Sequence, residues 1–244
     1  MPFTFSHPAL VVPFFAAGKK YLSLSGLVMG SMAPDFEYFF RMKKGISQYS
    51  HTPAGLLYFN LPLSLLLLFL FHEMVRKPLI LHLPPWLFKR FYIYYKFQWR
   101  PYFKKHWPGV VISILAGSIT HLGWDWLTHS TADYLYAQQH RFFFFSSWQH
   151  HSVIYTLVHS MHSFAGLAVL AATVRKKPAG PYIERSAAWV PFWIMLVAGA
   201  FLITLVRFLF TEQLQTGDLL VTIIAAFLLA LLFVSLLMNA QHKP

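Results

Sequence analysis

The stretch Gly117–His129, GSITHLGWDWLTH, places three polar side chains in an otherwise apolar run. His121, Asp125 and His129 follow one another at intervals of four residues. On an α-helix this spacing puts all three on one face, one per turn. Hydrocarbon disfavours such groups unless they pair, bind an ion or line a wet cavity. The stretch therefore predicts a membrane helix that carries either a polar packing cluster or, the interpretation we favour, a set of metal ligands.

The composition of the chain indicates an integral membrane protein. Its 244 residues are 57% hydrophobic and only 11% charged, whereas soluble domains are about 25% charged. The fold class we predict is all-α: a polytopic membrane helical bundle forming a single domain over residues 1–244. The absence of cysteine excludes disulfides, thiolate metal sites and a cysteine nucleophile. The net charge of +12 fits cytoplasmic loops and anionic lipid headgroups, and no nucleic-acid module accompanies it.

Apolar runs predict five transmembrane helices within residues 53–238, since about 20 apolar residues cross a bilayer. Their expected bounds are Pro53–Val75, Pro108–Thr131, Ser146–Val174, Ala187–Phe210 and Leu219–Leu237. The segment 76–108 contains eight Lys and Arg residues among many aromatic ones, and we predict a loop in the headgroup layer. His72 and Glu73, just before it, are expected to be ordinary interfacial residues.

Residues 1–52 are predicted to form a lead-in and a half-helix. Prolines interrupt the first twenty residues, which favours an irregular or interfacial segment. In Tyr21–Phe40 the apolar part is too short to span a membrane, and Pro34 ends its helix directly before Asp35. We therefore predict a half-helix or re-entrant element that carries Asp35 into the protein interior. The alternative is that Asp35 is only a local turn residue beside Pro34.

The charges between the spans predict an orientation. Segments 76–108 and 175–186 contain eight and four Lys and Arg residues, and the alternate segments 132–146 and 211–218 contain one and none. The richer segments are expected on the cytoplasmic side. This orientation brings five polar side chains to the same, outer half of the bilayer: His51, Asp125, His129, His150 and His151.

Four motifs in order carry a family resemblance. They are Phe5-Ser6-His7-Pro8, Gly30-Ser31-Met32-Ala33-Pro34-Asp35, Ser50-His51-Thr52 and Thr120-His121-x-x-Trp124-Asp125-x-x-Thr128-His129. Together they resemble a family of bacterial membrane proteins catalogued as domain of unknown function 4184. More distantly, the proline–aspartate pair, the serine–histidine pair and the His-x-x-x-Asp helix resemble the membrane-bound metal-dependent hydrolases of bacterial inner membranes. That resemblance implies a bacterial cytoplasmic membrane and the site residues His7, Asp35, His51, His121 and Asp125.

The predicted function is metal-assisted hydrolysis of a lipid-linked ester or phosphodiester in the membrane. The cofactor we expect is a divalent metal, zinc first and iron or manganese as alternatives. Its expected ligands are His7, Asp35, His51, His121, Asp125 and His129. A bound ion of this kind lowers the pKa of its water to about 7 and polarises a carbonyl or phosphoryl oxygen. His150 and His151 are the candidates for general acid or base.

Two alternatives stay open at this point. Gln149-His150-His151 and His159-x-x-His162 resemble the histidine boxes of di-iron oxygenases, although such boxes face the cytoplasm and these are expected on the other side. The second alternative is a non-enzymatic transporter, ion or proton pathway, or assembly factor, in which buried His and Asp side chains relay protons or ions. Metal content, oxygen dependence and transport assays distinguish the three.

Overall fold

The computed structural model describes residues 4–18, 20–45, 47–142, 148–178, 180, 189–211 and 216–241, without the side chains of 14, 16–17, 130–142, 148–155, 216 and 240–241. Every regular element in these ranges is helical. Five helices are long and apolar enough to cross a membrane: Leu56–His82, Trp99–His129, Thr156–Lys176, Trp189–Leu209 and Gly217–Asn239. The predicted all-α membrane fold with five spans is therefore confirmed.

The N-terminal segment is a series of short helical pieces. They are a 3₁₀ turn at Thr4–Ser6, α1 (Pro8–Gly18), α2 (Leu24–Gly30), a second 3₁₀ turn at Ala33–Asp35 and α3 (Phe36–Arg41). None of these pieces reaches the length of about 20 residues that a span needs. This agrees with the prediction of a helix too short to cross the membrane. The lead-in is helical rather than irregular. Pro8 occupies the first position of α1, where a proline loses no helical hydrogen bond, and the helix continues through Pro13.

The first span is continuous but changes its helical pitch. It consists of a π-helix at Leu56–Asn60, α4 (Leu61–Leu70), a second π-helix at Phe71–Val75 and α5 (Arg76–His82). α6 (Pro85–Phe91) and a 3₁₀ turn at Tyr92–Tyr94 follow, and α7 (Trp99–Phe142) begins well before its expected start. The prediction of a loop over 76–108 is therefore wrong for most of this segment, which is helical. Its lysines and arginines suit a headgroup layer, but they are also good helix formers.

The long helix α7 is bent near its beginning. Its backbone leaves helical geometry at His106, with φ −123° and ψ 18°. Pro108 lies two residues further on, and a proline inside a helix removes a hydrogen bond and produces a kink. The part of α7 after this kink carries His121, Asp125 and His129.

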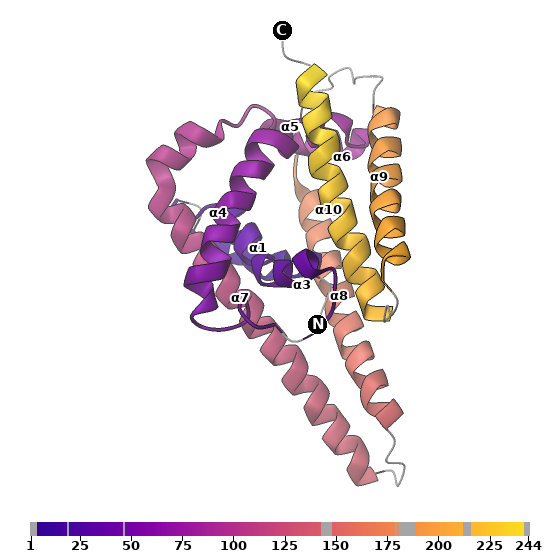
Figure 1. Ribbon diagram of the computed structural model, residues 1–244. Coiled ribbons are helices and arrows are strands. Elements are labelled where there is room, and N and C mark those ends of the chain that lie inside the picture. The colour runs from indigo at the N-terminus through magenta and orange to yellow at the C-terminus, as the bar shows by residue number, and fades with distance from the viewer. Residues whose placement is uncertain are drawn as a thin grey trace. The chain divides into compact units, whose positions relative to one another are not determined.

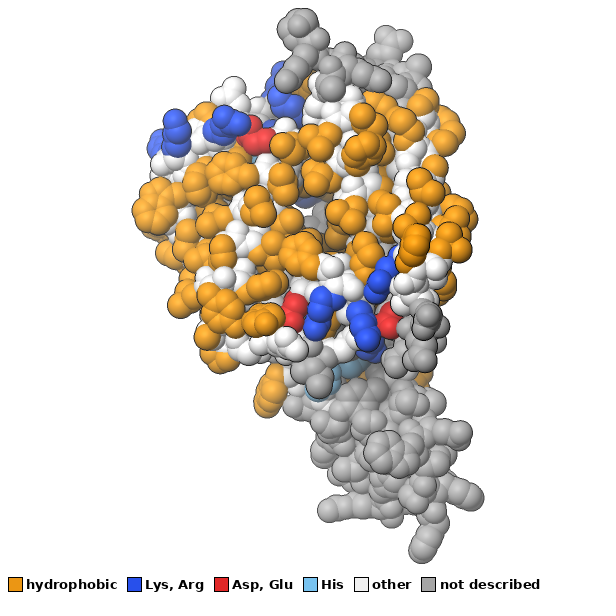
Figure 2. Space-filling view, in the orientation of Figure 1, with side chains coloured by type: hydrophobic (Ala, Val, Ile, Leu, Met, Phe, Trp, Pro, Cys, Tyr) orange, Lys and Arg blue, Asp and Glu red, His pale blue; other side chains and the backbone are white. Residues whose placement is uncertain are grey.

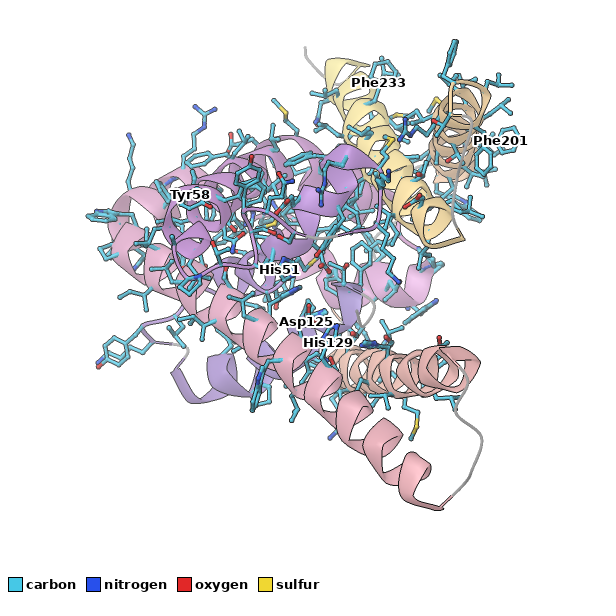
Figure 3. All side chains as sticks on the ribbon, turned by 60° about the horizontal axis from the view of Figure 1, so that its bottom comes forward. His51, Tyr58, Asp125, His129, Phe201 and Phe233 are labelled. Atoms are coloured by element: carbon cyan, nitrogen blue, oxygen red, sulfur yellow. The ribbon has the colours of Figure 1, made fainter. Side chains whose placement is uncertain are left out.

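The last three helices are α8 (Trp148–Lys176), α9 (Trp189–Leu209) and α10 (Thr216–Gln241). α9 and α10 run side by side (Figure 1) and bury Phe192 against Val234 and Met238. Large apolar side chains such as Phe201 and Phe233 remain exposed, at 67% and 63% (Figure 3). Hydrophobic side chains also dominate the face drawn in Figure 2. Exposed apolar area on this scale is typical of a surface that lies against lipid.

The contacts divide the chain into two compact units. The first comprises Met1–Asp35, Tyr49–Ser64 and Trp107–Lys176, and the second comprises Phe36–Gln48, Leu65–His106 and Lys177–Pro244. Each is described by itself below, and the single membrane domain expected from the sequence stays a prediction.

In the first unit, α2 packs closely against α7 through small residues. A Cβ atom on Gly30 or on Gly117 would lie 2.1 or 2.3 Å from a carbonyl oxygen of the facing helix, so only glycine permits this approach. The Ser118 hydroxyl donates to the Gly30 carbonyl at 3.0 Å across the same contact. The approach brings the C-terminal end of α2 against His121 of α7, where the polar cluster begins.

Candidate metal centre

Five polar side chains from separate segments of the first unit converge in its interior. They are His7, Asp35, His51, His121 and Asp125. His7 lies just before α1, Asp35 ends the 3₁₀ turn after α2, His51 lies in the turn that precedes the first span, and α7 carries the other two. Four of the five residues are at most 7% exposed. His51 is the most open, with 17% of its side chain exposed.

Asp125 faces three imidazoles with its two oxygens. Its Oδ1 is 3.3 Å from Nε2 of His7. Its Oδ2 is 3.6 Å from Nε2 of His51 and 3.7 Å from Nε2 of His121, one helical turn earlier. Figure 3 shows Asp125 on α7 with His51 beside it. The carboxylate is therefore the meeting point of the N-terminal segment, the turn before the first span and α7.

Asp35 completes the cluster from the other side. Its Oδ1 is 3.6 Å from Nε2 of His121 and 3.9 Å from Nε2 of His51. Its Oδ2 accepts a short hydrogen bond from the Thr4 hydroxyl, which turns Oδ1 toward the histidines. Within the described part of the chain, Asp35 Oδ1 and His121 Nε2 are buried and have no hydrogen-bond partner. Buried polar atoms are rarely left in this state.

The outer nitrogens of the histidines are held by the chain. Nδ1 of His121 donates to the Ser31 carbonyl at 2.8 Å, and Nδ1 of His7 donates to the Thr4 carbonyl at 3.2 Å. A carbonyl can only accept, so a neutral His7 or His121 has its proton on Nδ1 and a lone pair on Nε2. Nδ1 of His51 lies 2.9 Å from the Ser50 hydroxyl. Metal-binding histidines are oriented in this way, by a bond from their second nitrogen.

The cluster has the donors and the spacing for a metal ion. Two groups, His7–His121–Asp125 and Asp35–His51–His121, each have their ligand atoms within 4.8 Å of one another. Ligands about 2.1 Å from a tetrahedral ion lie about 3.4 Å from one another. The separations between Nε2 and carboxylate oxygens run from 3.3 to 3.9 Å. The residues present therefore fit a metal ion held between them.

Comparison with known proteins identifies the family. A profile described as "Domain of unknown function (DUF4184)" matches residues 1–238. This chain belongs to DUF4184. The membership expected from the four motifs is thus confirmed, and the match includes all five residues of the cluster. No curated protein and no solved structure is significantly similar to the chain.

The other predicted site residues of this DUF4184 protein lie apart from the cluster or outside the described side chains. His129 is one turn beyond Asp125 on α7 (Figure 3). Its Nδ1 donates to the Asp125 backbone carbonyl at 2.6 Å, its ring lies 5.0 Å from that of His159, and it belongs to neither ligand group. His150 and His151 belong to α8, and their side chains are outside the described residues. Their proposed roles stay predictions.

Three residues that support the DUF4184 cluster were not predicted as site residues. Thr4 binds Asp35 with its hydroxyl and His7 with its carbonyl, Ser31 binds His121, and Ser50 binds His51. Ser31 and Ser50 lie within the motifs of the sequence, and Thr4 precedes one. The partners of Thr4 and Ser31 can be 31 and 90 residues away, so no local pattern indicates which groups meet.

Proposed function

We propose that this protein is a membrane-embedded metal-dependent hydrolase that holds a divalent ion in the cluster of His7, Asp35, His51, His121 and Asp125. One observation carries the proposal: two buried carboxylates face the lone pairs of imidazole nitrogens. A carboxylate oxygen and an imidazole lone pair repel one another unless a proton or a metal cation lies between them. A buried charge without a compensating partner is costly.

The balance of charge supports a divalent ion. Two carboxylates contribute two negative charges, and the imidazoles are neutral when they act as ligands. Among the described side chains, no Lys or Arg lies within 4.0 Å of Asp35 or Asp125. A divalent ion neutralises the pair. Zinc takes imidazole and carboxylate ligands in sites of this kind, and iron and manganese accept the same donors.

The surroundings of the cluster favour hydrolysis of a substrate that resides in the membrane. When bound, such an ion supplies an activated water and polarises a carbonyl or phosphoryl oxygen. His51, the most open residue of the cluster, marks the side from which water and substrate reach it. Thr4 and Ser31 hold Asp35 and His121 in place. Since the cluster lies in a protein of membrane-spanning helices, the substrate class we propose is a lipid-linked ester or phosphodiester.

Metal analysis of the reconstituted protein tests the proposal. The protein is placed in lipid nanodiscs, stripped with a chelator, reloaded with zinc and measured by inductively coupled plasma mass spectrometry. We expect about one zinc per chain, and loss of it in Asp125→Asn, which keeps the size of the side chain and removes its charge. Asp218→Asn is the matched control, because Asp218 is a buried carboxylate of the second unit that accepts the Lys44 backbone N–H. Full zinc in Asp125→Asn contradicts the proposal.

A proton or ion pathway is the second candidate, because His7 and Asp125 are close enough at 3.3 Å to share a proton. If the protein binds no metal but moves protons into liposomes, and if Asp125→Asn abolishes this transport, the proton pathway becomes the function in place of hydrolysis. The described histidine pair of the oxygenase alternative does not join the cluster: Nδ1 of His162 donates to the backbone of its own helix, and neither His159 nor His162 belongs to a ligand group.

A further inference from the structure

We propose that the reacting group of the substrate is an uncharged carbonyl, the acyl ester of a lipid, and not a phosphoryl group. This inference rests on the proposed hydrolase function and narrows its substrate class. It follows from two properties of the site: its net charge when one divalent ion is bound, and the absence of Lys and Arg among the described side chains beside its carboxylates.

The geometry first indicates a single ion. The two ligand groups share one atom, Nε2 of His121. That nitrogen lies 3.6 Å from Asp35 Oδ1 and 3.7 Å from Asp125 Oδ2. Its one lone pair binds one ion, because Nδ1 is engaged with the Ser31 carbonyl. An ion bound to His121 therefore has both carboxylates as neighbours, and the ion with its ligands carries no net charge.

Among the described residues of the first unit, no basic side chain lies beside the carboxylates that would hold that ion. The unit contains five Lys and Arg residues: Lys19, Lys20, Arg141, Arg175 and Lys176. Arg141 follows Asp125 on α7 by about 24 Å, at about 1.5 Å per residue. Lys19 lies outside the described residues. Lys20 precedes Tyr21, whose carbonyl lies against Gly109, about 18 Å before His121 along α7.

The last two basic residues lie at the end of α8. This helix contacts the N-terminal segment at Gly166, where a Cβ atom would lie 2.9 Å from the Ser6 carbonyl oxygen. Arg175 and Lys176 are about 13 Å or more further along α8. Within the described side chains, no Lys or Arg approaches either carboxylate of the cluster within 4.0 Å. The described side chains of the first unit thus place no positive charge beside the two carboxylates beyond that of the ion.

This charge pattern distinguishes the two substrate classes. In phosphoryl transfer, Lys, Arg and metal ions together stabilise the charge that is spread over the phosphoryl oxygens. A phosphodiester is already an anion, and moving it into a neutral, largely buried site costs its hydration without an ion pair in return. A carbonyl enters without charge. Only the oxygen that becomes negative in the transition state needs stabilisation, and one ion can supply it.

The reaction needs no further reactant than water. The water oxygen forms a bond to the carbonyl carbon, the bond from that carbon to the ester oxygen breaks, and one water proton is transferred to the departing alkoxide. The products are a carboxylic acid and an alcohol, with no oxidation or reduction. His51 marks the open side of the cluster. Leu57 and Tyr58, at the start of the span that follows it, are 62% and 55% exposed and offer an acyl chain an apolar surface.

A single lipid tests the inference, since phosphatidylglycerol contains both acyl esters and a phosphodiester. Zinc-loaded protein in phosphatidylglycerol nanodiscs is incubated, and the lipids are analysed by mass spectrometry, with Asp125→Asn as the control. We expect equal amounts of fatty acid and lysophosphatidylglycerol from the wild-type protein alone. Diacylglycerol or phosphatidic acid would overturn the carbonyl assignment and leave the hydrolase function intact. A zinc-loaded protein that cleaves neither bond would overturn both.

A binding measurement gives a second readout that does not depend on turnover. Cobalt(II) replaces zinc, and its visible absorption bands are followed during titration with acetohydroxamic acid, which binds a metal ion through its carbonyl oxygen, or with inorganic phosphate. We expect the hydroxamic acid to change the bands at a concentration at least tenfold lower than phosphate does. Phosphate that binds equally well, or better, overturns the inference even where metal binding itself is confirmed.

Discussion

Both compact units bury histidines, but the neighbours of these histidines differ. In the first unit, His121 is fully buried and faces the carboxylates of Asp35 and Asp125. In the second unit, His72 is 6% exposed and stacks on Trp99, with ring centroids 4.3 Å apart and planes 7° from parallel. The expectation that His72 is an ordinary interfacial residue is therefore wrong. Within the described residues, neither of its ring nitrogens has a hydrogen-bond partner.

The difference shows that burial of a histidine is not itself a sign of a site. A neutral imidazole can be accommodated by stacking on an aromatic ring, as His82 also is on Phe192 at 4.5 Å. A buried carboxylate needs hydrogen-bond donors or a cation, as Asp218 of the second unit has in the Lys44 backbone N–H. Asp35 and Asp125 distinguish the first unit because they face imidazole nitrogens, and Asp35 Oδ1 has no hydrogen-bond donor among the described residues. Replacing a histidine that faces these carboxylates should therefore affect zinc binding, and replacing a stacked histidine should not.

The largest effect is expected from replacing His121 by phenylalanine, with the same replacement at His72 as the control. His121→Phe removes the ligand atom shared by both groups, and we expect zinc affinity to fall by more than about 100-fold. His72→Phe keeps the ring that stacks on Trp99, and zinc affinity should not change. Competition with a fluorescent zinc chelator measures both variants. Equal losses in the two variants would remove the distinction between the units.

The second effect concerns the close packing of α2 against α7, which places the Ser31 carbonyl beside His121. Gly117→Ala adds a Cβ atom 2.3 Å from the Leu27 carbonyl, so we expect about 1–3 kcal/mol of destabilisation together with weaker zinc binding. Gly123→Ala is the control on the same helix, because no atom lies within 4 Å of its Cβ position. Thermal unfolding in detergent and zinc titration measure both. A Gly117→Ala protein as stable as the control contradicts the packing argument.

The third effect concerns the hydroxyl that orients Asp35. Thr4→Val preserves the shape of the side chain and removes the donor to Oδ2, and loss of such a supporting bond lowers metal affinity by about 10–100-fold. Thr4→Ser should restore most of the affinity. As a control, Thr120→Val removes a hydroxyl that binds the Gly117 carbonyl on α7 and should leave zinc binding unchanged. If Thr4→Val binds zinc as the wild type does, Thr4 does not position Asp35.

The smallest effect is expected at His129. The sequence predicts it as a ligand, whereas its Nδ1 is bound to the Asp125 backbone carbonyl and its ring lies beside that of His159. From this geometry, His129→Ala should change zinc affinity by less than about threefold, well below the effect expected for a supporting bond. Zinc titration of this variant decides whether His129 is a ligand, as its spacing from His121 and Asp125 predicts, or lies outside the ligand set, as the structure indicates. A loss as large as that of His121→Phe would return His129 to the ligand set.

Much of the fold followed from local patterns. The five spans were predicted within a few residues at most ends, because the thickness of the hydrocarbon layer sets the length of an apolar run. The segment 76–108 was misjudged, since Lys and Arg suit both headgroups and helices. For the cluster, the spacing of His121 and Asp125 placed them on one helical face, and Asp35 was expected beside them because a half-helix is tolerated only in a protein interior.

The sequence by itself determined that this is a helical membrane protein with His and Asp side chains placed in its apolar runs, because run length and helical spacing are local properties of the chain. Only the tertiary structure decided which of them meet. His7 and Asp125 are 118 residues apart, and Ser31 and His121 are 90 apart. Their contact depends on glycines that let α2 approach α7. The direction of each ring nitrogen, and with it the set of atoms that can hold an ion, follows from that packing.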